Sequence, residues 1–278
     1  MSGKYPFKIY RKPEFQSSSL IVAWNEDVGK LGSKAIDYLN QRLGGQEFAE
    51  IDPVEFFPLG GVQIEDDLAQ FPESKFYACQ ENNLVTFKSN PPRFEWYKFL
   101  KSILDVAEHS CRAKEIYTIG GMVTLSAHTA PRELFAIANF PEMREVLSQY
   151  DLGIDMDYQA PRGQRPTLNS FLLWVAKKEN IPGVCLWVPI PFYLIAMEDP
   201  RAWKKVLEFF DKRFDLKIDF SDLDQAIQDQ DEKLTQARLR FPDIDEYIRR
   251  LESNIGLSEE ENEKLVKEIE EFLGETSF

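Results

Sequence analysis

The sequence predicts an α/β protein, with a three-layer α/β/α domain over residues 1–220 and an acidic helical appendage over residues 221–278. Strand-like and helix-like patterns alternate from residue 19 to residue 214, which is typical of a sheet covered by helices on both faces. After Asp219 only helical patterns remain. A chain of 278 residues that is 43% hydrophobic can bury a core of this size.

The first predicted elements form a strand–helix–strand unit. Ser19–Trp24 is an apolar run typical of a buried strand. Apolar residues then recur at helical spacing from Val28 to Leu43, and Gly44-Gly45 supplies the left-handed position at which many helices end. Gln46–Ile51 is the second strand. We therefore expect a βαβ unit at the start of the domain.

A hairpin and a helix come next. Lys75–Ser89 is predicted to form the hairpin, because Asn82-Asn83 tolerates the positive φ of a tight turn. Phe94–Cys111 carries apolar residues at spacings of three and four, which predicts an amphipathic helix.

The segment after this helix holds the candidate ligand site. Glu115–Ile119 is predicted to be a buried strand, and Gly120-Gly121 to end it where the backbone turns sharply or approaches a neighbour. Leu134–Ala138 is the next short strand. Ligands of open α/β sheets bind in loops at the carboxyl ends of strands. The candidate ligand-binding residues are therefore the two glycines and five hydrogen-bonding residues of this loop: Gly120, Gly121, Thr124, Ser126, His128, Thr129 and Arg132.

The domain closes with a helix, a strand and a second helix. Thr167–Asn180 and Arg201–Phe214 are the predicted helices, the latter with Pro200 in its first turn. Gly183–Pro189 is a strongly apolar strand between them.

An aromatic lip follows this last strand. Pro191, Phe192 and Tyr193 are expected at the same sheet edge as the Gly120-Gly121 loop. A rigid aromatic lip fits the rim of a pocket, and it also fits a subunit interface, where aromatic residues are enriched. Both interpretations stay open, and the three residues are the candidate interface.

The appendage is helical and strongly acidic. One helical pattern runs from Ser221 to Leu251 with a bend at Pro242, and a second begins at the capping box Ser258–Glu261 and reaches Leu273. Residues 221–278 contain 17 acidic and 7 basic residues, a net charge of −10, and the whole chain carries −14. Such a surface repels a phosphate backbone, so we expect no nucleic-acid partner.

Motifs for common chemistries are missing from the sequence. No GxGxxG, GxxxxGK[ST] or GxSxG pattern occurs, and two histidines with three scattered cysteines give no zinc spacing. We therefore expect no catalytic residues, no metal and no cofactor. Cys79, Cys111 and Cys185 are expected to be reduced and buried, as in a cytoplasmic protein. No apolar run approaches the roughly 18 residues of a membrane helix, and the N-terminus does not resemble a secretory signal.

Several polar residues have two interpretations. His128 is either a general base or a hydrogen-bond donor that binds an anion, or it is a loop histidine that hydrogen-bonds the backbone. His109 is expected to interact with carbonyl groups at a helix end. Asp155 with Asp157 fits a carboxylate pair or solvated loop acids. Arg162 and Arg165 fit an anion clamp or a surface loop.

Three segments in this order resemble the proteasome-assembly-chaperone-2 family: LIVAWNEDVGKLGSKAIDYL, YTIGGMVTLSAHTAPRELFAIAN and WVPIPFYLIAMEDPRAWKKVLEFF. The resemblance covers residues 19–220, and the acidic helices look like the extension of bacterial members. It implies a phosphorylase/hydrolase-like fold and homo-oligomers, and supplies no catalytic residues. Archaeal and eukaryotic relatives assist proteasome assembly, some by docking a C-terminal hydrophobic-Tyr-X tripeptide. Thr276-Ser277-Phe278 does not match that tripeptide.

Two functions are consistent with these observations. The first is a non-enzymatic, oligomeric assembly-chaperone-like or scaffolding protein with a protein partner, in the cytoplasm and away from membranes. The second is a phosphorylase/hydrolase-like enzyme or a binder of a nucleoside, nucleotide or phosphate, using the loop after the Gly120-Gly121 strand. In the second, Arg132 would hold phosphate and His128 would move a proton.

Overall fold

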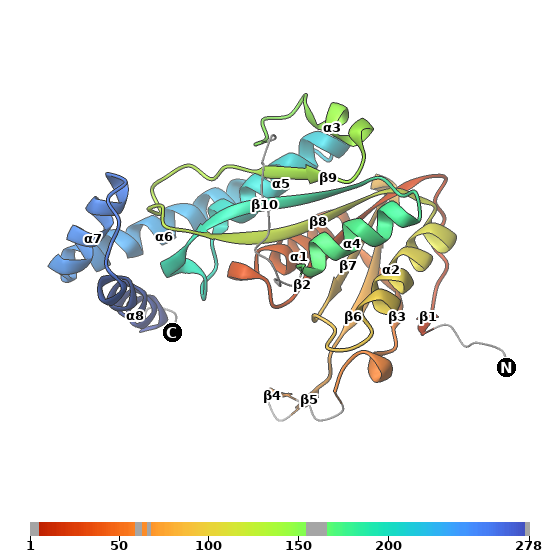
Figure 1. Cartoon of the computed structure of the whole chain (residues 1–278), viewed down its shortest axis with the longest axis horizontal. Helices are drawn as coiled ribbons and strands as arrows, with labels where there is room; N and C mark the ends of the chain where they lie inside the picture. Colours follow the sequence, from red (N-terminus) through yellow and green to blue (C-terminus); the bar gives the residue numbers. More distant parts are fainter. Residues whose placement is uncertain (1–5, 59–62, 66–67, 154–165, 276–278) are drawn as a thin grey trace. The chain divides into compact units, whose positions relative to one another are not determined.

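A computed structural model describes residues 6–58, 63–65, 68–153 and 166–275. It contains a mixed eight-stranded sheet in the order β1-β3-β6-β7-β2-β8-β10-β9, and a separate pair, β4-β5 (Figure 1). The strands are β1 (Phe7–Ile9), β2 (Ser18–Trp24), β3 (Gln46–Ile51), β4 (Gln63–Glu65), β5 (Leu68–Gln70), β6 (Ser74–Cys79), β7 (Leu84–Ser89), β8 (Ala113–Thr124), β9 (Phe135–Ala138) and β10 (Gly183–Pro191). The α-helices are α1 (Leu31–Leu43), α2 (Trp96–Cys111), α3 (Pro141–Leu147), α4 (Leu168–Lys178), α5 (Pro200–Phe214), α6 (Ser221–Arg240), α7 (Pro242–Glu252) and α8 (Glu259–Glu275).

The chain divides into two compact units by its internal contacts. The first comprises Met1–Asp27, Gly32–Gly120 and Phe135–Leu186, and the second comprises Val28–Leu31, Gly121–Leu134 and Trp187–Phe278. Strands β8 and β10 each begin in the first unit and end in the second. The second unit therefore includes residues on both sides of the expected boundary at residue 220. That boundary stays a prediction about domain organisation.

Strand directions in the first unit confirm the predicted βαβ unit and hairpin. Strand β2 pairs in parallel with β7 and with β8, where Leu20 lies opposite Val85 and Ile116. Strand β6 is antiparallel to both β7 and β3, so β3 runs in the same direction as β2. The β6–β7 hairpin turns at Asn83, whose φ is 54°, and fills the sheet between the two strands that α1 connects.

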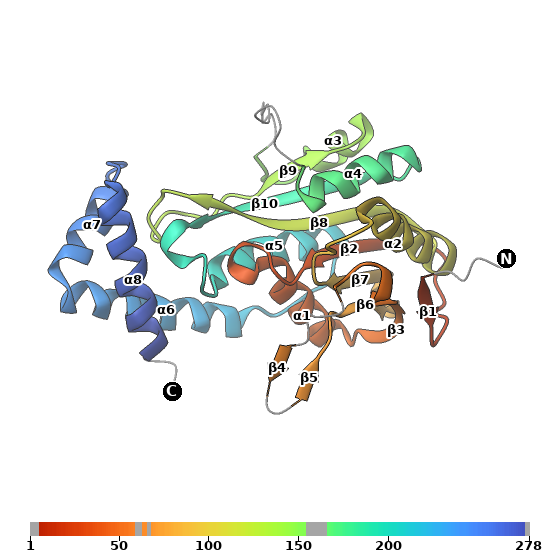
Figure 2. The same ribbon diagram turned by 60° about the horizontal axis from the view of Figure 1, so that its bottom comes forward.

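Neighbouring residues of β2 show that helices cover both faces of the sheet. A Cβ on Gly32 of α1 would lie 2.7 Å from the Cβ of Ala23. On the next residue, the indole Nε1 of Trp24 donates to Oδ1 of Asn169 on α4 at 2.7 Å, and its ring lies 6.5 Å from that of Phe99 on α2. Successive strand residues point to opposite faces. Helix α1 therefore covers one face, and α2 with α4 covers the other, as Figures 1 and 2 show. The predicted three-layer fold is confirmed.

Strand β8 is longer than the sequence predicts. It continues through both glycines to Thr124, so the prediction that it ends at Gly120 is wrong. Glycine is needed at position 121 for a close approach, because a Cβ there would lie 2.5 Å from the carbonyl oxygen of Val28. Of the two roles expected for the glycine pair, a sharp turn or a close approach to a neighbour, Gly121 therefore has the close approach.

The C-terminal helices follow the predicted pattern closely. The bend expected at Pro242 is a complete break, since Phe241 is extended (φ −122°, ψ 100°) and α7 starts at the proline. The capping box before α8 is confirmed by two hydrogen bonds. The Ser258 backbone N–H donates to Glu261 Oε2 at 2.7 Å, and the Glu261 N–H donates to Ser258 Oγ at 3.3 Å.

A partly buried carboxyl group follows the central strand β2. The Gly32 backbone N–H donates to Oδ2 of Asp27 at 2.9 Å. The other oxygen, Oδ1, is buried and accepts no hydrogen bond from the described residues. Burial raises the pKa of Asp27 to about 7, although hydrogen bonds from Gly32 and from its own backbone N–H act in the opposite direction.

We predict that the Asp27 carboxyl makes the protein less stable as the pH rises. Folded Asp27 keeps its proton up to about pH 7, whereas the unfolded chain releases it near 3.8. The stabilisation is therefore complete below about pH 4 and is lost as the pH passes 7, by up to about 4 kcal/mol. Asp27→Asn should remove this dependence and raise the unfolding free energy above neutrality, measured by urea denaturation at several pH values. The exposed neighbour, changed as Glu26→Gln, is the control and should keep the wild-type slope. A slope that survives in Asp27→Asn would contradict the assignment.

Candidate functional site

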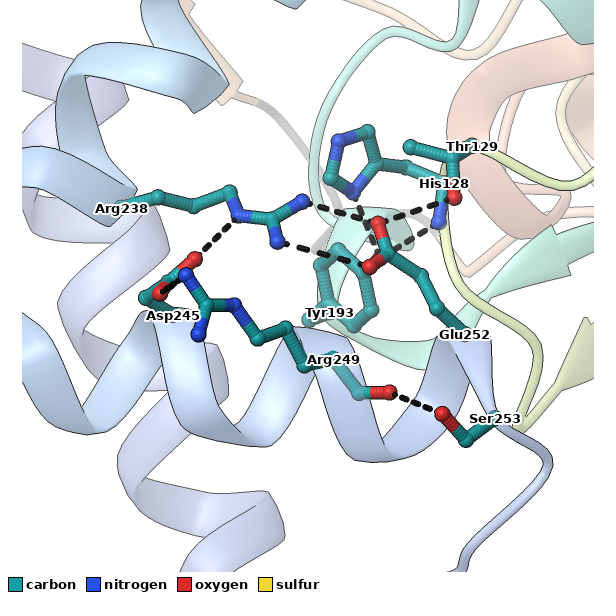
Figure 3. Close-up of polar contacts among 8 residues, drawn as sticks. All are labelled: His128, Thr129, Tyr193, Arg238, Asp245, Arg249, Glu252 and Ser253. Carbon is teal, nitrogen blue, oxygen red and sulfur yellow. Dashed lines mark hydrogen bonds and ion pairs between the residues drawn. The ribbon is translucent and has the colours of Figure 1, made fainter.

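The loop after β8 is hydrogen-bonded to other segments of the second unit. Among them are the 3-10 turn η4 (Phe192–Leu194) and helix α7, and α7 is in turn bonded to helix α6. Figure 3 shows the contacts, which we call the polar network. Its members are His128, Thr129, Tyr193, Arg238, Asp245 and Glu252.

His128 and Tyr193 form the buried part of the polar network. The Tyr193 hydroxyl accepts the His128 backbone N–H at 2.6 Å and lies 2.9 Å from Nδ1 of the same histidine. We assign Nδ1 as the acceptor of the tyrosine proton, because each group then has a partner. The two side chains are 5% and 1% exposed. Burial, with a smaller contribution from Arg238, lowers the pKa of His128 to about 4, so the ring is neutral at pH 7. Burial also raises the pKa of Tyr193.

Arg132 lies at the other end of the loop in a buried ion pair. Its Nε donates to Oδ2 of Asp199 at 2.9 Å, and its Nη1 donates to the carbonyl oxygen of Ala130 at 2.8 Å. The other Asp199 oxygen accepts the backbone N–H of Ala202 and caps α5. Nη2 of Arg132 is buried and has no hydrogen-bond partner among the described residues. Two of the three guanidinium nitrogens of Arg132 are thus hydrogen-bonded within the second unit.

Glu252 at the end of α7 connects the loop to the C-terminal helices. Thr129 Oγ1 donates to Glu252 Oε1 at 3.2 Å, and Arg238 Nη1 donates to the same oxygen at 2.8 Å (Figure 3). Arg238 also donates from Nε to Oδ1 of Asp245 at 2.8 Å. Burial alone would raise the pKa of Glu252, but the hydrogen bond and charge of Arg238 outweigh it and lower the pKa.

A small recess lies beside the polar network in the same unit. Thr124 and Ser126 contribute hydroxyl groups that lie 2.8 Å apart. The volume of the recess is about 230 Å³. Its walls come from the end of β8 and the residues after it, and from the end of α7 and the turn that follows: Thr124, Leu125, Ser126, Leu251, Asn254, Ile255 and Gly256.

The structure therefore divides the candidate ligand-binding residues into three groups. Gly120 and Gly121 lie within β8. Thr124 and Ser126 line the recess. The remaining three, His128, Thr129 and Arg132, hydrogen-bond to other parts of the second unit. Whether any of these residues binds a ligand stays a prediction.

The aromatic lip lies next to the loop, as the sequence analysis expects. Pro191, Phe192 and Tyr193 are all buried, and the Tyr193 hydroxyl reaches the loop directly. A role in an interface stays a prediction. Because the side chains point inward, they would affect a partner mainly by fixing the loop.

Sequence reasoning missed the partners that hold the loop. Arg238 and Glu252 lie on two different helices, and no periodicity of either helix indicates that they meet. Asp199 carries a signal that was available, since an acidic residue before a proline at a helix start is a typical N-cap. That signal predicts the cap and does not predict the ion pair with Arg132.

Other candidates lie elsewhere or outside the described residues. His109 Nδ1 lies 3.0 Å from the carbonyl oxygen of Asp105, in agreement with the expected contact at a helix end. The pair Asp155 and Asp157, the pair Arg162 and Arg165, and the C-terminal residues 276–278 lie outside the described residues.

The described part of the chain contains no group of three or more His, Cys, Asp or Glu side chains placed to hold a metal ion. The three cysteines are buried, as expected. Within the described ranges, every helix is too short or too polar to cross a membrane.

The PAC2 family matches residues 20–238. The chain belongs to the PAC2 family. The family resemblance in the sequence analysis is thereby confirmed. Among curated proteins, none is similar enough to count as a relative.

Several solved structures share the fold. A proteasome-assembly chaperone homologue of Mycobacterium tuberculosis has a TM-score of 0.69 at 18% identity, covering 83% of this chain and 99% of its own. A protein of unknown function from Corynebacterium glutamicum has a TM-score of 0.76 at 18% identity, with 90% and 97% covered. An archaeal proteasome activator of Pyrococcus furiosus has a TM-score of 0.67 at 20% identity, with 84% and 98% covered. At these identities the likeness concerns the fold.

We predict that Tyr193→Phe destabilises the protein by about 1–3 kcal/mol. The change removes only the hydroxyl, and it leaves the buried N–H of His128 without its acceptor. Urea denaturation at neutral pH measures the loss. Tyr97→Phe is the matched control, because Tyr97 is 46% exposed and its ring contact with Trp174 needs no hydroxyl. An equal effect of the two changes would mean that the hydrogen bonds to Tyr193 contribute nothing.

We also predict that His128 makes the protein more stable as the pH rises from about 4 to about 6.5. Within this range the unfolded chain binds a proton that the folded histidine excludes, so the unfolding free energy rises by up to about 3 kcal/mol. Asp27 acts in the opposite direction over the same range. The test is therefore made in the Asp27→Asn background, with and without His128→Asn. The positive slope should appear in the first protein and be absent from the second, and a flat profile in both would contradict the assignment.

Proposed function

We propose that the protein is a non-enzymatic, oligomeric assembly-chaperone-like or scaffolding protein that binds a protein partner. One observation carries the proposal. His128, Thr129 and Arg132, which would serve a ligand in the loop after β8, instead hold the loop to other parts of the second unit. Membership of the PAC2 family supports the same interpretation.

The chemistry of the loop supports a structural role for these side chains. A general base works best with a pKa near the operating pH, whereas burial and the nearby Arg238 lower the pKa of His128 to about 4. Its Nδ1 is also engaged by Tyr193. Arg132 would hold a phosphate through its guanidinium, but Asp199 already neutralises that charge in a buried pair.

The descriptions of two structural relatives agree with a protein partner. One is a proteasome-assembly chaperone homologue and another is an archaeal proteasome activator. We infer from them only the class of partner, a protein, because identities of 18% and 20% establish fold and no more. Self-association of this chain is part of the same proposal.

A small-molecule site is the second candidate, and one observation favours it. Nη2 of Arg132 is buried without a hydrogen-bond partner in the described part of the chain. A buried guanidinium nitrogen of this kind is normally satisfied by a water molecule or by a ligand. Removal of Arg132 is a poor test, since the lost ion pair would leave Asp199 buried and unpaired.

We predict that nucleosides, nucleotides, phosphate and sugar phosphates leave the thermal unfolding midpoint unchanged. A ligand at about a hundred times its dissociation constant would add about 2.7 kcal/mol and move the midpoint by several degrees. Light scattering on the same sample should give a mass of at least twice the 32.3 kDa of one chain. A saturable thermal shift would replace the proposal with the second candidate, and a monomeric mass would remove self-association from it.

A further inference from the structure

The recess beside the polar network has the size of a side-chain site. Its volume of about 230 Å³ is below the roughly 300–1,000 Å³ of pockets that enclose small molecules. An aliphatic side chain of a partner fits within such a space.

Exposed apolar side chains surround the recess. Leu125 is 62% exposed and Ile255 is 53% exposed, and both line the recess. Val123, one residue before the lining segment, is 51% exposed. Large apolar side chains gathered at a depression mark interaction sites more often than scattered ones do. The recess thus has exposed apolar side chains at its rim and the hydroxyl groups of Thr124 and Ser126 in its lining.

Hydrogen bonds hold both walls of the recess in place. On one side, Thr129 ties the loop to Glu252. On the other side, the Ile255 N–H donates to the carbonyl oxygen of Arg250 at 2.8 Å, and the Arg250 guanidinium donates to the carbonyl oxygen of Gly256 at 2.7 Å. A site that is ordered before binding loses less conformational entropy when a partner arrives.

The charge around the recess indicates the chemistry of the partner. Residues 221–278 carry a net charge of −10, and α7 and α8, on either side of the recess residues 254–256, belong to this segment. At the recess, Arg250 is paired with Glu261. Glu259 and Glu260 come three and four residues after Gly256, and neither forms an ion pair with any described residue. This surface complements a basic segment.

We propose that the recess is a docking site for a basic segment of a protein partner, which inserts one aliphatic side chain between Leu125 and Ile255. The proposal rests on the proposed function, because it identifies the kind of protein surface that this chain binds. The aliphatic side chain supplies affinity by burial, and the flanking lysine or arginine residues supply charge complementarity.

The test uses the full chain and three fluorescent peptides in about 0.15 M salt. The first peptide has one leucine flanked by lysines and arginines, the second has serine in place of leucine, and the third has leucine flanked by glutamates. Fluorescence anisotropy should show binding of the first, about tenfold weaker binding of the second, and no binding of the third. Equal affinity for the first two would overturn the proposal, because the binding would then be electrostatic only.

Variants of the protein locate the binding. Leu125→Ser and Ile255→Ser should each weaken the first peptide about tenfold and leave the second unchanged. Leu239→Ser is the matched control, since Leu239 is 81% exposed in α6 of the same unit. Loss of binding in the control, or unchanged binding in both recess variants, would contradict the assignment. Because Leu125 and Ile255 are exposed, unchanged thermal midpoints should show that the variants fold.

The outcome is separable from that of the proposed function. If the peptides fail to bind while the chain forms oligomers and no small molecule shifts its midpoint, the recess is not the docking site and the proposed function stands. If a small molecule shifts the midpoint, the proposed function itself fails.

Discussion

The ion pair between Arg132 and Asp199 fixes the part of the second unit that carries the candidate site. Both side chains are almost completely buried, so each charge depends on the other and on nearby backbone groups. The Asp199 carboxylate caps α5 through its second oxygen, and Arg132 also binds the carbonyl oxygen of Ala130. Breaking a buried pair of this kind costs about 3–5 kcal/mol, because one charge is left uncompensated. The path of the loop and the start of α5 are therefore set by one carboxylate.

The fixed path of the loop determines the chemistry of the residues before Arg132. His128 lies where the Tyr193 hydroxyl can bond both its backbone N–H and its ring. Burial lowers the pKa of the imidazole to about 4, so the ring is neutral and does not exchange protons readily near pH 7. Thr129, the next residue, is directed to Glu252 of α7. The loop is thus a structural connection between β8, η4 and the C-terminal helices.

The sequence predicts most elements of the fold, because their patterns are local. The apolar run of β2, the positive φ of Asn83 and the capping box at Ser258 all concern residues close together in the chain. Gly121 is an instructive failure. Its role is to let the strand pass close to the carbonyl oxygen of Val28, about ninety residues earlier in the chain. Such a distant contact leaves no local signal, so the glycine pair resembles the end of a strand although it lies inside β8.

The candidate site could be predicted only in part for the same reason. The sequence identifies the loop and the lip around Tyr193 as neighbours, since both follow strands at one sheet edge. It does not identify what the side chains do there. Arg132 and Asp199 meet across 67 positions, and Thr129 and Glu252 across 123, so neither pairing follows from periodicity or spacing. Histidine and arginine in a polar loop look the same whether they bind a ligand or hold the loop.

The charges of the C-terminal helices divide into two groups with different consequences. Basic residues are used between helices: Arg238 pairs with Asp245 and Glu252, and Arg250 pairs with Glu261. The segment has 17 acidic and 7 basic residues, so a net charge of −10 remains and its surface is negative overall. Such a surface accelerates encounters with basic partners but discriminates poorly between them. To discriminate between basic partners, the protein needs a short-range contact that depends on the shape of one partner side chain. The recess beside Leu125 and Ile255 has a suitable size and an apolar rim for such a contact.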